Sequence, residues 1–206
     1  LAIMNVIFSY GMDVAFLRFF ILEEDRRAKQ TIFSTVFWMI LLSGVLFALA
    51  MLLLPGPFSR LILGGAGYEP LIRIASGILL ADALALIPFL VLRALEKSAL
   101  FALLKSAGIV LNLGLNIWLV VGRRMGIEGV FLANLTASAL TLVILLPVTL
   151  QWLRARFDRG TLTELFRFGL PYIPSLLSVV IMDQIGRFFL DRMEGPEATG
   201  LFSAGY

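Results

Sequence analysis

The 206-residue sequence contains no cysteine and no histidine. These absences exclude disulfide bonds, thiol chemistry and zinc sites built on Cys and His ligands. They also exclude a histidine proton relay, so coupling to a proton or a cation has to use carboxylates. We expect no metal site and no cofactor in the chain, and we assign no catalytic residue.

Charged residues are also scarce. They make up 15% of the chain, and 60% is hydrophobic, whereas soluble domains are about 25% charged and roughly 45–50% apolar. The mean hydropathy is +0.96. This composition predicts an integral membrane protein. The net charge of +3 is explained by the Lys and Arg residues that concentrate in the cytoplasmic loops of membrane proteins. Nucleic-acid binding is not expected, because no basic run is interleaved with stacking aromatics.

Long apolar runs predict an all-α fold of six transmembrane helices plus the start of a seventh. The expected helices cover about residues 1–22, 31–54, 71–95, 99–122, 130–150 and 164–193. The connections are a charged loop at 23–30, a Gly/Pro-rich segment at 55–70 with a short amphipathic piece, a tight turn at 122–129 and an amphipathic surface linker at 151–164. Because the chain begins at Leu1 within an apolar run and residues 200–206 resemble a helix start, we expect a fragment of a longer protein.

The distribution of Lys and Arg predicts the orientation of the helices. Alternate connections contain ten and five of these 17 residues, and the positive-inside rule places the richer set in the cytoplasm. Segments 23–30, 96–98 and 151–164 would then be cytoplasmic. In this frame Asp13 and Asp82 lie in mid-membrane, Arg18 and Arg93 in the inner half, and Arg187 toward the outer leaflet. Charges at graded depths suit a path across the membrane better than a single bound cofactor.

Residues 164–193 contain charges within an apolar run. Asp183, Arg187 and Asp191 are spaced four apart, which places them on one helical face. A charge in mid-bilayer costs roughly 2.5–3.5 kcal/mol on insertion scales, so it faces protein or water. Asp191 lies near the outer end and could be an interface cap. Arg18 either extends to the interface or faces the same interior as Asp13.

Polar residues form stripes on three other helices. Asp82 and Arg93 are eleven apart, about three turns, and share a face. Lys105, Asn112 and Asn116 form a second stripe, whose amides either bond between helices or line a polar cavity. A weaker stripe, for which helix packing is favoured, consists of Asn134, Ser138 and Thr141.

Three prolines are candidate hinges. Pro88 removes one backbone hydrogen bond inside its helix and should bend the helix there. The bend is either a hinge that moves in transport or an ordinary kink of a membrane helix. Pro171 and Pro174 belong to a Gly-Leu-Pro-Tyr-Ile-Pro break at the start of the last long helix. This break would let that helix bend.

In four segments the sequence resembles the MOP flippase superfamily, specifically its branch of O-antigen and lipid-linked oligosaccharide flippases. YGMDVAFLRFF (10–20) is similar to the G-x-D-x-A-x-x-R-F signature of the family's second helix. IPFLVLRALEKSALFAL (87–103), GIVLNLGLNIWLVVGRRMGIEGVFLAN (108–134) and FRFGLPYIPSLLSVVIMDQIGRFFLDR (166–192) resemble helices four, five to six, and seven. The chain departs from the family at Gly186-Arg187, where Asp-Arg is frequent.

The resemblance implies helices two to seven of a MATE-like transporter whose two six-helix lobes enclose a cavity. Residues 1–150 would belong to the first lobe, which lacks its first helix here, 151–164 to a cytoplasmic linker, and 165–206 to the second lobe. The implied activity is alternating-access flipping of a polyprenyl-pyrophosphate-linked oligosaccharide across a bacterial or archaeal cytoplasmic membrane. No bond is broken in this process, so the protein would not be an enzyme.

The implied roles of the polar residues follow from the chemistry of that substrate. Guanidinium groups suit phosphate, and the candidates are Arg18, Arg93 and Arg187. Carboxylates would neutralise these arginines or bind a coupling H⁺ or Na⁺, and the candidates are Asp13, Asp82 and Asp183. Amides would bond sugar hydroxyls or neighbouring helices, and the candidates are Asn112 and Asn116.

Two alternatives stay open. A cation-coupled multidrug exporter of the MATE type would favour acidic and aromatic cavity residues over arginine. A non-transporting membrane scaffold would instead use Asp183, Arg187 and Asp191 as a buried ion network. Apart from the bilayer and the lipid-linked substrate, polysaccharide polymerase or assembly proteins are the partners to expect.

Overall fold

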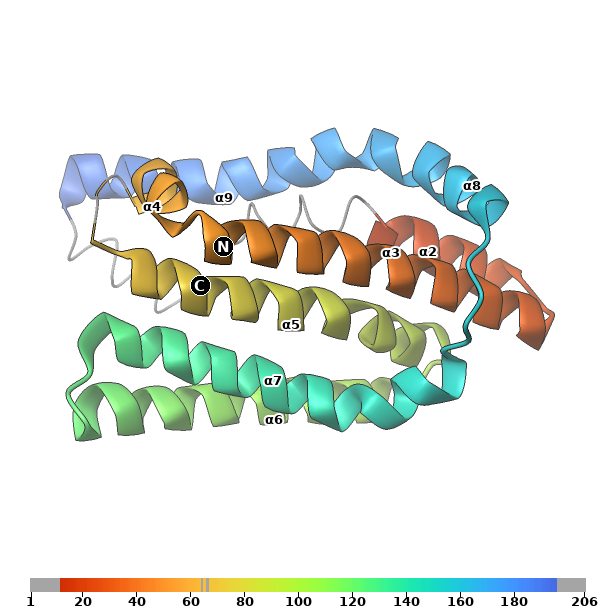
Figure 1. The fold of residues 1–206 in the computed structure, drawn as a ribbon, viewed down its shortest axis with the longest axis horizontal. Coiled ribbons are helices and arrows are strands. Elements are labelled where there is room, and N and C mark those ends of the chain that lie inside the picture. The colour runs from red at the N-terminus through yellow and green to blue at the C-terminus, as the bar shows by residue number, and fades with distance from the viewer. Residues whose placement is uncertain (1–11, 64, 66, 196–206) are drawn as a thin grey trace.

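A computed structural model describes residues 12–63, 65 and 67–195, and this part of the chain is helical without strands (Figure 1). Its elements are α2 (Met12–Leu22), α3 (Arg26–Leu53), α4 (Pro55–Leu63), α5 (Glu69–Ala94), α6 (Ser98–Asn116), the π-helical η1 (Ile117–Gly122), α7 (Gly126–Trp152), α8 (Arg159–Gly169), the 3-10 turn η2 (Leu170–Tyr172) and α9 (Ile173–Glu194). The predicted all-α class is therefore confirmed.

Four helices in the described part are long and apolar enough to cross a membrane: α3, α5, α6 continued by η1, and α7. They match four of the six predicted spans. Half of the predicted first span falls on residues 1–11, outside the described residues, and α2 represents the other half. The expected start of a seventh helix at 200–206 is also outside them. The count of six plus a seventh and the division into two lobes stay predictions.

The long helices lie side by side with alternating direction (Figure 1). α5 occupies the middle and packs against α2 and α3 on one side and α7 on the other, while α6 packs mainly against α7. α8 packs against α2 and α3 on the far side from α7. The connections at 23–25, 95–97 and 153–158 lie at one end of the bundle, as the alternating directions require (Figure 1). These connections fall within or beside the three segments predicted to be cytoplasmic.

Two helix starts differ from the prediction. The segment 23–30 was expected to be a loop, but α3 begins at Arg26. The reason is Asp25, whose side chain accepts a hydrogen bond from the backbone N–H of Ala28 at 3.1 Å and caps the helix. The tight turn expected at 122–129 is shorter too, because α7 begins at Gly126. Arg124 and Gly126 both have positive φ (56° and 60°), which reverses the chain between the two helices.

Glycines allow the central helices to approach closely. A Cβ added at Gly44 of α3 would lie 3.1 Å from a methyl of Leu80 on α5, and one at Gly77 of α5 would lie 3.0 Å from a methyl of Leu135 on α7. Membrane helices associate through van der Waals packing, and small residues at their interfaces permit it. These contacts fix how α5 is rotated relative to its two neighbours, and this rotation decides which of its side chains face the cavity described below.

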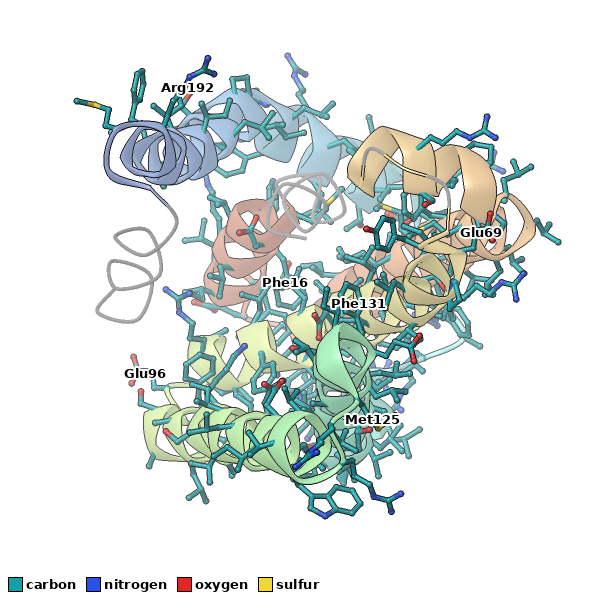
Figure 2. All side chains as sticks on the ribbon, turned by 90° about the vertical axis from the view of Figure 1, so that its left-hand side faces the viewer. Phe16, Glu69, Glu96, Met125, Phe131 and Arg192 are labelled. Atoms are coloured by element: carbon teal, nitrogen blue, oxygen red, sulfur yellow. The ribbon has the colours of Figure 1, made fainter. Side chains whose placement is uncertain are left out.

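The main apolar core lies where α2, α3 and α5 meet, and one buried residue each from α7 and α8 joins it. The Phe16 and Phe20 rings stack with centroids 5.0 Å apart, and Phe20 meets the Trp152 ring edge-on at 5.1 Å. Leu165 of α8 is fully buried in the same cluster. Figure 2 shows Phe16 in the interior of the bundle. The core thus joins the beginning of the described chain to the segment that follows α7.

The segment 153–158 is hydrogen-bonded to the first turns of α3. The hydroxyls of Ser34 and Thr35, both fully buried, accept from the backbone N–H groups of Arg154 and Asp158 at 2.7 and 3.1 Å. The indole N–H of Trp38 donates to the carbonyl of Arg154 at 3.1 Å. An amphipathic surface linker was expected at 151–164. In the structure, α7 continues to Trp152, this short segment is attached to α3, and α8 then runs through the expected boundary at 164/165.

The predicted prolines take three different positions. Pro88 is buried inside α5, which stays helical through it. Pro171 lies in the 3-10 turn η2, and Pro174 lies in the first turn of α9. The expected break in the Gly-Leu-Pro-Tyr-Ile-Pro segment is therefore confirmed as a one-turn 3-10 interruption between α8 and α9. The role of these three prolines as hinges stays a prediction.

Candidate functional site

A cavity of about 880 Å³ is bordered mainly by α2, α5, α6 and α7. Its apolar lining includes Leu86 and Phe89 of α5 and Leu104 of α6. The polar residues that line it come from four helices: Asp13, Asp82, Arg93, Lys105, Asn112, Asn116, Asn134, Ser138 and Thr141. Polar and charged groups at this depth are expensive unless they face protein or water. The cavity is what they face.

The cavity unites three of the polar stripes read from the sequence. Asp82 and Arg93 both line it, as their eleven-residue spacing on α5 predicted. The Lys105–Asn112–Asn116 stripe of α6 lines it as well. The stripe on α7 was expected to serve helix packing, yet Asn134, Ser138 and Thr141 also face the cavity. Their spacing of four and three residues showed that they share one face of α7. It could not show that this face borders a cavity, because that depends on how α7 packs.

A polar cluster lies near mid-length of α5. The hydroxyl of Ser138 donates to Oδ1 of Asp82 at 2.6 Å and so joins α7 to α5. The ammonium of Lys105 lies 4.4 Å from the centroid of the Phe89 ring, within the range of a cation–π interaction. Lys105 is also near enough for its charge to act on Asp82. Arg93 adds a second positive charge to the cavity lining, about three turns along α5 from Asp82.

Three asparagines form a chain of amides farther along α6. Asn112 donates from Nδ2 to Oδ1 of Asn134 at 2.9 Å, which joins α6 to α7. Asn116 donates from Nδ2 to Oδ1 of Asn112 at 2.7 Å and to its backbone carbonyl at 2.9 Å. Asn134 donates to the carbonyl of Val130 at 2.9 Å. Both uses foreseen for the Asn112–Asn116 pair therefore occur together: the amides bond between helices and line the cavity.

Asp13 of α2 contributes a carboxylate from the other side of the cavity. Its Oδ1 is buried and accepts no hydrogen bond from the described residues. Leaving a buried acceptor unpaired costs about 1–3 kcal/mol, more for a charged group. Such groups are rare in native proteins. Asp13 lines the polar cavity, so its carboxylate can interact with whatever occupies that cavity.

Arg18 does not line the cavity that the described residues form, although it was predicted to do so together with Arg93. Its guanidinium carbon lies 4.3 Å above the centroid of the Phe168 ring on α8, and the side chain is exposed. The physical reason is helical geometry. Arg18 follows Asp13 by five positions, a rotation of about 140° around α2, so one side chain faces the cavity while the other faces α8. Arg18 was expected either to extend to the membrane interface or to face the same interior as Asp13. It instead makes a cation–π contact with Phe168.

The remaining predicted site residues lie on α9. The side chains of Asp183 and Arg187 are outside the described residues, so their roles stay predictions. Among the described residues, no group of three or more Asp or Glu side chains is placed to hold a metal ion.

Comparison with known proteins places this arrangement in a family. A family model described as polysaccharide biosynthesis protein matches residues 1–206. No curated protein and no solved structure matches the chain. With several helices long and apolar enough to cross a membrane, the match indicates a multi-pass membrane protein of polysaccharide synthesis or export. The chain belongs to the polysaccharide biosynthesis protein family, which is related to the MOP flippases.

Proposed function

We propose that the protein flips a polyprenyl-pyrophosphate-linked oligosaccharide from the cytoplasmic to the outer leaflet of the cytoplasmic membrane of a bacterium or an archaeon, for export of cell-surface polysaccharide. The observation that carries this proposal is the polar cavity among helices of membrane-spanning length. Its cationic part suits a pyrophosphate, and its amides suit sugar hydroxyls. The substrate crosses intact, so the protein acts as a transporter and not as an enzyme.

Arg93 and Lys105 are the residues to which we assign the pyrophosphate. Both line the cavity from adjacent ends of α5 and α6. Arg presents a planar set of donors to phosphate oxygens, and Lys adds a point charge. In the absence of substrate, Asp82 balances the charge of Lys105, which lies near enough to act on it. Arg187 would continue the anion path in the second lobe.

Coupling to an ion would use Asp13. Its unpaired, buried Oδ1 is an acceptor that a proton or Na⁺ would satisfy. Binding there would neutralise a charge in mid-membrane and so favour one conformation of the cavity over the other. Asp183 would serve the same purpose in the second lobe.

Alternating access requires the two lobes to move relative to each other. We assign the pivot to the 3-10 turn η2 with Pro171 and Pro174, because the chain up to α8 is packed onto α2 and α3. Pro88 would allow α5 to adjust as the cavity opens. The two six-helix lobes themselves are part of this proposal.

The test is transport by the purified protein in liposomes. Wild type should move polyprenyl-pyrophosphate-linked N-acetylglucosamine between leaflets, measured as its accessibility to an external modifying reagent. Arg93→Gln and Lys105→Gln should each slow this movement about tenfold or more, because hydrogen bonds to charged groups are worth about 1.5–3 kcal/mol. Arg73→Gln is the matched control, since Arg73 is exposed on the same α5 and does not line the cavity.

Normal transport by both cavity variants would refute the assignment of the anion path. If wild type moved none of this lipid but exported small organic cations against a proton or Na⁺ gradient, the multidrug-exporter alternative would replace the proposal. If it transported neither, the scaffold alternative would.

A further inference from the structure

The three amides at the far end of the cavity are oriented by groups that leave only one arrangement. A backbone carbonyl can only accept a hydrogen bond. Asn134 therefore has to turn its NH₂ group to the carbonyl of Val130, at 2.9 Å, and Asn116 has to turn its NH₂ group to the carbonyl of Asn112, also at 2.9 Å. Two backbone carbonyls, one on each helix, thus set the direction of both outer amides.

Asn112 lies between them, and its own direction follows. Because the NH₂ group of Asn134 is committed, Oδ1 of Asn134 faces Asn112 and accepts from its Nδ2 at 2.9 Å. Oδ1 of Asn112 then accepts from Nδ2 of Asn116 at 2.7 Å. The chain of donation runs from Asn116 through Asn112 and Asn134 to Val130. Oδ1 of Asn116 is left over, and no described residue donates to it.

The amides also retain donors. Each NH₂ group carries two N–H bonds, and Asn112 and Asn134 each use one of them. The surface therefore offers both an acceptor and donors to a ligand. Phosphate oxygens at neutral pH mainly accept, and they need donors alone. Hydroxyl groups donate and accept at once, so the amide cluster is complementary to a polyol and not to an anion.

The position of the cluster separates it from the cationic residues. Lys105 and Asn116 are eleven residues apart on α6, about 16 Å along the helix axis. Both line one cavity. A ligand that filled this cavity lengthwise would meet Lys105 and Arg93 with one part and Asn116 with another.

We propose that Asn116 is the hydroxyl acceptor of a sugar-binding subsite at this end of the cavity, held in place by Asn112 and Asn134, and that the substrate binds with its pyrophosphate at Arg93 and Lys105. This inference rests on the proposed function and adds to it a direction of binding. Asn112 and Asn134 are positioning residues, and Asn116 is the one that contacts the sugar.

The test compares two probes on the purified protein in lipid nanodiscs. They are polyprenyl pyrophosphate carrying one N-acetylglucosamine and the same lipid without the sugar. Wild type should bind the sugar-bearing lipid about two- to tenfold more tightly, as one additional hydrogen bond allows. Asn116→Ala should bring the two dissociation constants together by weakening only the first. Lys105→Gln should weaken both lipids by a similar factor, and Ser106→Ala, exposed on the same helix and away from the cavity, should change neither.

Equal affinity of wild type for the two lipids would overturn the subsite while leaving the proposed function intact. A loss of both lipids by Asn116→Ala in equal measure would overturn it as well, since that pattern means a damaged cavity. If wild type bound neither lipid, the proposed function and the subsite would both fail. Because the first comparison uses wild type alone, the inference stays falsifiable even where a variant does not fold.

Discussion

The hydrogen bonds between α3 and the segment 153–158 lead to a sharp prediction. Ser34 and Thr35 are fully buried, and their hydroxyls accept from the backbone N–H groups of Arg154 and Asp158. The variants Ser34→Ala and Thr35→Val each remove one acceptor and keep the side chain close to its original volume. We expect segment 153–158 to open more often in both, because its backbone loses partners that the rest of the structure does not replace.

The magnitude follows from the bonds that are lost. One intramolecular hydrogen bond contributes about 1 kcal/mol net, so each single variant should raise the population of the open segment about fivefold. The two bonds involve separate N–H groups four residues apart. If their contributions add, the double variant loses about 2 kcal/mol, and the open population rises about thirtyfold.

Limited digestion with trypsin measures this opening, because the segment contains its own cleavage sites at Arg154 and Arg156. Cleavage there follows the open population when opening and closing are fast relative to proteolysis. The rate is measured by mass spectrometry relative to cleavage at Arg60, which is exposed elsewhere in the chain. Ser43→Ala is the control, since Ser43 donates to Ile40 of its own helix and does not contact the segment.

Unchanged cleavage at Arg154 in the double variant would refute the reasoning. It would mean that the apolar core of α8, including the fully buried Leu165, holds the segment without help from the hydroxyls. The packing of α8 onto α2 and α3 would then be the only support for placing the pivot at η2.

Two further predictions concern helix ends and helix contacts. Asp158 caps α8, and hydrogen bonds from the side chain and the backbone N–H of Thr161 lower the pKa of the Asp158 carboxyl. The stabilisation of α8 by this carboxylate is therefore fully present above the unfolded pKa of about 3.9. It is lost as pH falls through the lower pKa of the folded state. The protection of α8 amides from hydrogen exchange, taken relative to their intrinsic exchange rate at each pH, should accordingly fall on acidification in wild type. It should fall less in Asp158→Asn, whose amide caps without titrating; identical profiles of protection against pH would refute this. Gly129→Ala should destabilise the α6–α7 pair by about 1–3 kcal/mol, because the new Cβ would lie 3.3 Å from a backbone carbon of Leu119. Gly114→Ala, which meets nothing within 4 Å, should instead raise the melting temperature, and a lower value for both would argue against the packing described.

Periodicity made part of the cavity predictable from the sequence. Asp82 and Arg93 had to share one face of α5, and Asn112 and Asn116 one face of α6, because an α-helix repeats every 3.6 residues. The cost of a charge in hydrocarbon then required these faces to meet protein or water. Composition predicted the membrane location for the same reason, since so few charges are available to cover a soluble surface.

Residues whose role depends on helix rotation were harder to predict. Arg18 lies on a different side of α2 from Asp13, and its contact with Phe168 of α8 could not be read from either segment alone. The amides of Asn112 and Asn134 meet only because α6 and α7 pack with these faces together. The early start of α3 could have been predicted from the sequence, because Asp25 is a typical N-cap residue just before it.

The sequence by itself determined that the chain is helical and membrane-embedded, where most spans lie, and which polar residues share a helical face. These properties depend on local spacing and on the free energy of placing side chains in hydrocarbon. Only the tertiary structure decided that three polar stripes line one cavity and that segment 153–158 is attached to α3. Those contacts join residues as far as 120 and 123 positions apart, and they depend on how each helix is rotated against its neighbours, which packing sets and local spacing does not.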